Sequence, residues 1–513
     1  MGIGFPGIGS STCTPQGGDR RDARTGAGRG IAVTIREIRW QNFRAFPDTG
    51  WLQIRPITVL LGTNNSGKSS ILNPLLLLKQ TLRSVRAQSA LVLRGELINA
   101  GSFSDFVHDH DSSQRVVFSL RFHSRRPADV SPPELGVVPP ALCELTFQAE
   151  AAPGIVSLHR YSVQDPFDRP LLVRTKAKSS QRYSLTAIQS WAAKADGEDA
   201  AASATDKAAR SAITQAKPNH FLFDGGPVLD EALDVTVKRN RKETVGDSDE
   251  DASPGRAEEL QLSSFVTKYI ATVEFTGDHV RGDLKDVVYL GPLRENPKRL
   301  YEISGDAPPD VGIRGQFSPE ILLRGRKKPL FRQVSNWLQK FDFPGQLTCE
   351  ELTETAFRLA LTAGPNSIPT NFADLGFGFS QLLPLLVQGL SAAKGTLFIT
   401  EQPEIHLNPR LQSRLAEFFL QVTKRNSRIL VETHSEHIIL GLRRLVAEGR
   451  LNSSDIAIYF VERPDGIIST VRSVPVQPNG HVDAADWPSG FFEDSLRESF
   501  ALASAQARRA HAD

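Results

Sequence analysis

Cysteine is scarce in this sequence of 513 residues, which contains only Cys13, Cys143 and Cys349. These three residues form no CxxC pair and lack the spacing of a zinc site. No disulfide framework is therefore implied, and such low cysteine usage is typical of a reducing compartment. We expect a cytoplasmic protein.

Long hydrophobic runs are missing as well. The longest, at residues 75–78, is flanked by polar residues and is too short to span a bilayer, so we expect no membrane partner. The first 30 residues are rich in Gly, Ser, Thr and Arg and contain no apolar core. We interpret residues 1–30 as a disordered extension or a misassigned start, and not as a signal peptide.

A strong net charge is also absent, because the 60 basic and 58 acidic residues leave only +2. Bulk charge therefore neither implies nor excludes a polyanion partner, and a nucleic-acid surface would have to be a local patch. The densest basic clusters lie at residues 238–242 and 324–328. Short clusters of this kind are either phosphate contacts or ordinary solvated surface.

The apolar residues, 40% of the chain, are nevertheless sufficient for a sizeable core, and the length allows two to four domains or one large interrupted domain. Residues 33–40 alternate as a strand would, and the apolar run 57–61 ends at Gly62, before a helix pattern from near Ser69 to about Arg83. Further on, β-like runs at 116–122, 143–147 and 155–161 predict an inserted antiparallel sheet.

Buried strands and amphipathic helices alternate in the second half. We expect strands at residues 287–290, 356–361, 396–400 and 428–432, and helices at 330–341, 379–390, 409–422 and 436–447. This alternation predicts an α/β fold with a largely parallel sheet. Between the two halves, residues 192–217 favour a helix, and 247–254 form an acidic, turn-like loop.

The most specific motif is GTNNSGKS at residues 62–69, which matches GxxxxGK[ST] between a predicted strand and a predicted helix. In this context, backbone amides curl around phosphate oxygens, and the helix N-terminus adds a favourable dipole. Lys68 would neutralise phosphates, and the Ser69 hydroxyl would bind Mg²⁺. The nucleotide-binding residues expected here are Gly62, Asn64, Asn65, Ser66, Gly67, Lys68, Ser69 and Ser70.

Two polar positions follow the next predicted strands. The strand 396–400 runs into Glu401, whose carboxylate could hold Mg²⁺ beside the phosphate loop. His434, directly after the strand 428–432, could hydrogen-bond the γ-phosphate or the attacking water. Many buried strands end in an acid and most isolated histidines are structural, so neither position is decisive alone.

A second glycine-rich helix start lies at residues 374–381, where Gly376, Gly378, Ser380 and Gln381 surround the predicted N-terminus. In isolation, this is an ordinary helix cap. A helix N-terminus also binds anions, however, and this one cannot reach the phosphate held by the first loop within an ordinary fold. The economical interpretation is that it binds the γ-phosphate of a nucleotide held by another copy.

The order of these motifs resembles the ABC-type ATPase heads of the structural-maintenance-of-chromosomes group. The chain looks most similar to AAA-family ATPases of the overcoming-lysogenization-defect kind. The segments that carry this resemblance are residues 35–46, 289–294 and 401–409. The tail at 487–492 looks like that of a subgroup with a C-terminal domain of unknown function. The resemblance covers roughly residues 31–110 and 285–495. It implies a P-loop NTPase fold with a mixed sheet, the cofactors ATP and Mg²⁺, and homodimers or higher homo-oligomers whose heads sandwich ATP.

The resemblance also assigns roles to residues. It implies that Ser69 and Glu401 bind the metal ion, that Gly376, Gly378 and Ser380 are the signature contacted in trans, and that His434 is the switch histidine. One departure matters: the usual catalytic glutamate is replaced by Gln402, and an amide cannot accept a proton from water. Either Glu404 is the base, with His434 assisting slow hydrolysis, or ATP acts mainly as a clamp.

The division that we expect is an extension at 1–30, head halves at 31–110 and 286–465, an inserted β-rich and helical region at 111–285, and a small C-terminal domain at 466–513. Only about 50 residues follow Arg463, too few for a typical domain, so we expect no intrinsic nuclease. A separate nuclease or toxin effector, and DNA, are candidate partners in phage defence or DNA maintenance. A non-hydrolytic ATP-gated scaffold and a transporter subunit are the alternatives.

Overall fold

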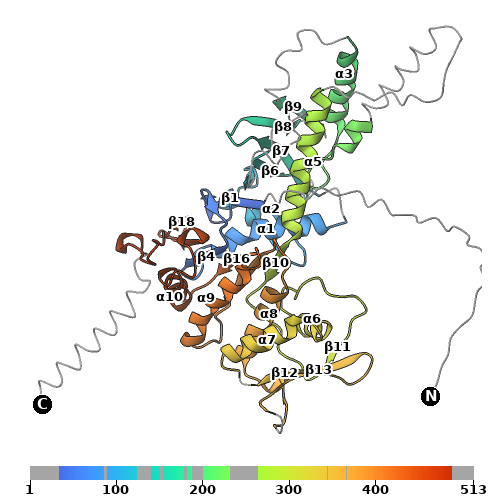
Figure 1. The fold of residues 1–513 in the computed structure, drawn as a ribbon. Coiled ribbons are helices and arrows are strands. Elements are labelled where there is room, and N and C mark those ends of the chain that lie inside the picture. Colours follow the sequence, from blue (N-terminus) through green and yellow to red (C-terminus); the bar gives the residue numbers. More distant parts are fainter. Residues whose placement is uncertain are drawn as a thin grey trace, which may run out of the picture.

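The computed structural model describes residues 34–85, 89–123, 140–150, 154–177, 182–187, 200–230, 264–343, 345–364 and 367–487. An antiparallel sheet occupies the upper part of the molecule, a parallel sheet the middle, and a small third sheet the lower end (Figure 1). The predictions for residues 1–30, 238–242, 247–254 and 488–492 lie outside the described residues.

The antiparallel sheet has the strand order β2-β1-β5-β6-β7-β8-β9, with β3 paired to β1. The sheet joins the N-terminal segment to the region expected as an insert, because β1 pairs along most of its length with β5. Its strands are β1 (Thr34–Phe43), β2 (Phe46–Asp48), β3 (Leu52–Gln53), β5 (Val116–His123), β6 (Leu142–Ala149), β7 (Val156–Gln164), β8 (Pro170–Lys176) and β9 (Tyr183–Ala187).

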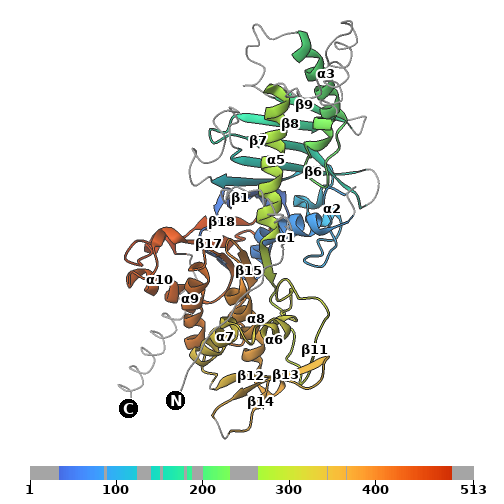
Figure 2. The ribbon, with the colours of Figure 1, turned by 45° about the vertical axis from the view of Figure 1, so that its right-hand side comes forward.

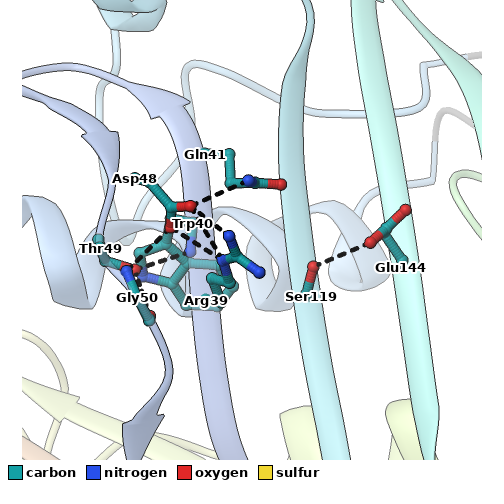
Figure 3. A network of polar contacts seen from close by, with 8 residues as sticks. All are labelled: Arg39, Trp40, Gln41, Asp48, Thr49, Gly50, Ser119 and Glu144. Carbon is teal, nitrogen blue, oxygen red and sulfur yellow. Dashed lines mark hydrogen bonds and ion pairs between the residues drawn. The ribbon is translucent and has the colours of Figure 1, made fainter. Parts of the chain in front are cut away.

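Trp40 on β1 ties this sheet to the helix that follows the phosphate loop. Its indole is fully buried, and Nε1 donates to the carbonyl oxygen of Ile71 at 2.9 Å. Its backbone amide donates to Thr49 Oγ1 at 2.9 Å, next to the ion pair of Arg39 with Asp48 (Figure 3). This strand edge therefore sets the position of the helix relative to the sheet.

The parallel sheet has the order β10-β15-β16-β4-β17-β18, and only β18 runs antiparallel to its neighbour. Its central strands are almost wholly buried apolar runs, as expected for strands covered on both faces. The strands are β4 (Ile57–Gly62), β10 (Val287–Leu290), β15 (Leu397–Glu401), β16 (Arg428–Glu432), β17 (Ile456–Glu462) and β18 (Thr470–Ser473). The predicted α/β fold class is confirmed.

The helices pack against these sheets, and α5 runs along the antiparallel sheet down to β10 (Figure 2). They are α1 (Lys68–Arg83), α2 (Phe103–Phe106), α3 (Ala200–Gln215), α5 (Ser264–Lys285), α6 (Ser318–Gly325), α7 (Pro329–Lys340), α8 (Phe377–Ser391), α9 (Pro409–Thr423) and α10 (Glu436–Ala447). The small sheet contains β11 (Tyr301–Glu302), β12 (Gln346–Glu351), β13 (Ala356–Thr362) and β14 (Thr370–Asn371).

The parallel sheet separates two hydrophobic cores. Successive residues of a strand point to opposite faces, so Leu60 and Leu430 join the core shared with the antiparallel sheet and α5. Val59 and Val431 join the core beneath α6 to α10. Because both faces are filled, functional groups on this sheet have to project from the carboxyl edge of its strands.

Among the described residues, no helix combines the length and the apolar character that crossing a membrane requires.

Candidate functional site

The loop between β4 and α1 has the geometry that its glycines predict. Gly62 and Gly67 have φ values of 149° and 100°, and a Cβ on Gly62 would lie 2.1 Å from the Val461 carbonyl oxygen. Gly67 caps α1 without any side-chain hydrogen bond, which leaves the first amides of the helix to other acceptors. The strand–loop–helix arrangement expected at residues 62–69 is therefore confirmed.

Lys68 lies folded over this loop. Its Nζ donates to the carbonyl oxygens of Gly62 at 3.1 Å and Thr63 at 2.6 Å. Burial lowers the pKa of Lys68, an effect that nearby glutamates oppose. The hydroxyl of Ser66 is buried and has no partner in the described structure, whereas Asn64 and Asn65 are exposed. A cation, free amides and an orphaned hydroxyl form a donor set that fits phosphate oxygens.

Ser69 connects the loop to the sheet. Its Oγ donates to Glu432 Oε2 at 2.8 Å and lies 3.5 Å from Glu401 Oε2. The two glutamates end the neighbouring strands β16 and β15, and they are register partners in the parallel ladder. The loop therefore faces a pair of carboxylates, of which sequence reasoning identified only Glu401.

Burial dominates the electrostatics of this pair. It raises the pKa of Glu401, and together with the charge of Glu401 it raises the pKa of Glu432 to about 7. In the described part of the chain, no group of three or more His, Cys, Asp or Glu side chains is arranged to hold a metal ion. An ion at Ser69, Glu401 and Glu432 would therefore need further oxygens, which the phosphates of a nucleotide can supply.

Tyr289 on β10 and Arg294 in the segment after β10 contact the Glu401 residue. The Tyr289 hydroxyl donates to Glu401 Oε1 at 2.6 Å. The buried guanidinium of Arg294 donates to the Glu401 carbonyl oxygen at 3.1 Å and to Gln381 Oε1 at 3.2 Å. Sequence reasoning noted these residues only as part of a resemblance, although β10 lies next to the Glu401 strand.

Glu404 and His434 are brought together. The backbone amide of His434 donates to Glu404 Oε1 at 2.7 Å, while Glu404 Oε2 is buried and has no protein partner. Burial raises the pKa of Glu404, and burial followed by the charge of Lys68 lowers the pKa of His434. The orphaned oxygen of Glu404 is therefore available to accept a hydrogen bond from water.

Gln402 takes up an uncommon backbone conformation, with φ at 45°. Its backbone N–H donates to the main-chain carbonyl oxygen of Glu432 at 2.7 Å. This hydrogen bond holds the segment after β15 against β16. Its side-chain amide offers both a donor and an acceptor but no base.

The glycine-rich start of α8 lies at the surface. Gly376 caps the helix without a side-chain hydrogen bond and is exposed, as is the neighbouring Phe377, which is 65% exposed. Ser380 and Gln381 are buried, and the Ser380 hydroxyl donates to the Phe377 carbonyl oxygen at 2.7 Å. Contact of Gly376, Gly378, Ser380 and Gln381 with a partner's nucleotide stays a prediction.

A cavity of about 400 Å³ adjoins the phosphate loop and is within the size range of ligand pockets. Asn65, Gly67 and Ser70 form its loop side, and Arg44 and the segment 107–110 form the opposite side. Ser70 itself is buried. This space can take the part of a nucleotide that extends beyond its phosphates.

The basic cluster at residues 324–328 is partly neutralised. Arg324 pairs with Glu320, and Arg326 pairs with Glu351. Lys327 and Lys328 are exposed, so this cluster keeps only a short stretch of positive surface.

Three family models match the chain. Residues 34–130 match the family described as "AAA ATPase domain", and residues 244–440 match "AAA domain, putative AbiEii toxin, Type IV TA system". Residues 451–502 match a "Protein of unknown function (DUF3696)". The matched segments include the phosphate loop, the strand that ends in Glu401 and the glycine-rich start of α8. No curated protein matches the chain.

The chain is also similar to solved heads of structural-maintenance-of-chromosomes proteins. A head bound to the C-terminal winged-helix domain of ScpA is 13% identical and has a TM-score of 0.39. The match covers 86% of this chain and 98% of the chain of that head. A head with an extended coiled coil bound to the C-terminal domain of ScpA, from Pyrococcus furiosus, is 12% identical, has a TM-score of 0.35, and covers 86% and 96%. A head from Thermotoga maritima is 11% identical, has a TM-score of 0.33, and covers 86% and 99%.

The matched segments and the geometry of the phosphate loop identify a P-loop ATPase domain of the AAA type in this chain, followed by a C-terminal segment that matches a family of unknown function.

Proposed function

We propose that this ATPase works by ATP-dependent pairing of two copies, each of which binds one Mg²⁺–ATP on its loop 62–69. The observation that carries the proposal is that the chain has two uncapped, glycine-started helix N-termini in different surroundings. The N-terminus of α1 meets Lys68, Ser69 and buried carboxylates, whereas the N-terminus of α8 is exposed. An exposed anion-binding helix start fits a phosphate that is held by another molecule.

Within one copy, the residues divide the work. Lys68 and the amides of the loop bind the phosphates, and Ser69 and Glu401 would hold the Mg²⁺ that accompanies them. The ion would supply positive charge on the phosphate oxygens. The cavity of about 400 Å³ would take the nucleoside.

We propose that hydrolysis is slow. Gln402 can orient water but cannot remove its proton, so Glu404 is our candidate for the base. Its orphaned Oε2 is the acceptor that water needs, and His434 is fixed beside it through its backbone amide. Gln402 also favours a second candidate function, an ATP-gated scaffold that binds without turnover.

For the setting we propose phage defence or DNA maintenance in the cytoplasm, with a separate nuclease or toxin as effector. The description of one matched family includes a toxin of a toxin–antitoxin system, which supports a defence role. DNA is the other partner that we propose. The exposed Lys327 and Lys328 are candidates for phosphate contact.

The test combines two measurements on the purified chain. We expect light scattering to show a dimer when ATP and Mg²⁺ are present and a monomer when they are absent, and we expect slow phosphate release in the same samples. A dimer without phosphate release would favour the scaffold. A monomer at saturating ATP would contradict the proposal.

A further inference from the structure

The carboxylate that the chain lacks after Glu401 is present one strand away. The position following Glu401 holds Gln402, but the neighbouring strand β16 ends in an acid, Glu432. Parallel pairing places Glu432 directly beside Glu401, at the same carboxyl edge of the sheet. The fold therefore places a second carboxylate beside Glu401, although the next residue in the sequence is an amide.

Glu432 is fixed toward the phosphate loop. Its side chain accepts a 2.8 Å hydrogen bond from the Ser69 hydroxyl, which is the shorter of the two contacts that Ser69 makes with carboxylates. Glu432 is 4% exposed, so water can neutralise little of its charge. It also lies on a rigid central strand, because β16 pairs with both β15 and β4.

The charges around this acid are not balanced within the protein. Glu401 and Glu432 at the strand ends, and Glu404 in the turn after β15, lie near Lys68, whose Nζ donates to loop carbonyls and not to a carboxylate. Arg294 is a further nearby cation, and its hydrogen bonds go to Gln381, Thr400 and a main-chain oxygen. Adjacent buried carboxylates repel each other unless a cation lies between them or they share a proton.

We propose that Glu432 binds the nucleotide-associated divalent cation together with Ser69 and Glu401, so that this site has two carboxylates where it was expected to have one. The inference rests on the proposed function, since it concerns the ion that accompanies ATP. An ion bound to the Ser69 hydroxyl at about 2.1 Å would lie within reach of the oxygen that now accepts from that hydroxyl.

The test measures metal binding directly. Mn²⁺ is titrated into the chain saturated with a non-hydrolysable ATP analogue, and free Mn²⁺ is followed by its electron paramagnetic resonance signal. Glu432→Gln keeps an oxygen that can accept from Ser69 but removes the charge. We expect its Mn²⁺ affinity to fall about 10- to 100-fold. Analogue binding measured in a metal chelator should not weaken, because without the ion the change only removes a negative charge near the phosphates.

Two further variants test whether a change in Mn²⁺ affinity comes from the charge of Glu432. Glu432→Asp keeps the charge on a shorter side chain, and it should bind Mn²⁺ better than Glu432→Gln does. Glu320→Gln is the matched control, because Glu320 on α6 is also a buried glutamate but forms an ion pair with Arg324 and accepts a hydrogen bond from the Ser304 hydroxyl. It should leave Mn²⁺ affinity unchanged.

The outcomes separate the two proposals. The inference is wrong if the unmodified chain binds the analogue and Glu432→Gln has the same Mn²⁺ affinity as the unmodified chain. It is also wrong if Glu432→Asp binds Mn²⁺ more weakly than Glu432→Gln does. In both cases Glu432 only positions Ser69. If the unmodified chain does not bind the analogue under any condition, the proposed function itself fails. If Glu432→Gln does not fold, Glu432→Thr takes its place, because threonine suits a strand and carries no charge. Mn²⁺ affinity equal to that of the unmodified chain would then overturn the inference.

Discussion

The N-termini of α1 and α8 start in the same way but have different surroundings. Both follow a glycine cap without a side-chain hydrogen bond, so both leave amides free for an anion. The α1 start is surrounded by Lys68, Ser69 and buried acids from two strands, whereas the α8 start presents Gly376 and an exposed phenyl ring. The start of α1 therefore has further polar groups for an anion within one chain, whereas the start of α8 would need groups from elsewhere.

This difference predicts which step each helix start controls. Changes at α1 should remove nucleotide binding and everything that depends on it. Changes at α8 should leave binding intact and remove only the steps that need a second copy. The four predictions that follow test this separation, from the largest expected effect to the smallest.

Replacing Lys68 should have the largest effect. Lys68→Ala removes the charge-assisted hydrogen bonds to phosphate, and we expect ATP affinity to fall about 100-fold, with dimerisation and phosphate release lost as a consequence. Fluorescence titration with a labelled nucleotide checks the affinity. Unchanged ATP affinity in a folded Lys68→Ala protein would mean that the loop does not bind the triphosphate.

Adding a negative charge at the α8 start should separate binding from pairing. A Cβ on Gly376 meets open space and its φ is negative, so Gly376→Glu fits the single chain. We expect ATP affinity within about twofold of the unmodified chain, and no ATP-dependent dimer in light scattering, because the new carboxylate repels a partner's phosphate.

Gly305→Glu is the matched control, since that position is also open and exposed. It should dimerise normally. An ATP-dependent dimer of Gly376→Glu with full stability would show that α8 does not face the nucleotide of a partner.

Removing the charge of Glu404 should affect only turnover. Glu404→Gln keeps the hydrogen bond from the His434 amide, and we expect phosphate release in a single turnover to slow by about 100-fold while binding and pairing persist. Gln402→Glu is the companion variant, and it should release phosphate faster than the unmodified chain. Full turnover by Glu404→Gln would show that another group accepts the proton.

Truncating Phe377 should have the smallest effect. The ring is 65% exposed beside Gly376 and 5.9 Å from the His406 ring, so a partner copy would bury it. We expect Phe377→Ala to weaken ATP-dependent dimerisation about tenfold in sedimentation, without a change in ATP affinity. Phe167→Ala is the control, since that ring is 76% exposed on another part of the molecule. If both variants weaken ATP-dependent dimerisation equally, Phe377 has no specific role in pairing.

Much of the fold could be predicted because its signals are local. The strands at 287–290 and 428–432 and the helix at 436–447 lie where periodicity placed them, and the loop at 62–69 follows from its glycines. Pairing between distant segments could not be predicted in this way. Nothing in β1 or β5 alone indicates that they share one sheet, because an antiparallel partner is chosen by tertiary packing.

The candidate site shows the same limit. Glu401 was found because it ends an apolar strand near a recognised motif, but Glu432 ends a similar strand and was passed over. Its importance depends on the register between β15 and β16, which brings it to Ser69. Tyr289 and Arg294 were missed for the same reason, since only the neighbouring position of β10 makes them partners of Glu401.

Complementation between two inactive variants tests the shared nucleotide most directly. In a dimer of Lys68→Ala with Gly376→Glu, the intact loop of the Gly376→Glu copy meets the intact α8 start of the Lys68→Ala copy, so one of the two composite sites is whole. We predict that an equal mixture recovers up to about half of the unmodified phosphate release, because neither variant pairs with itself, so every ATP-dependent dimer is mixed and has one whole site of two. No recovery, with mixed dimers present in the sample, would contradict the account.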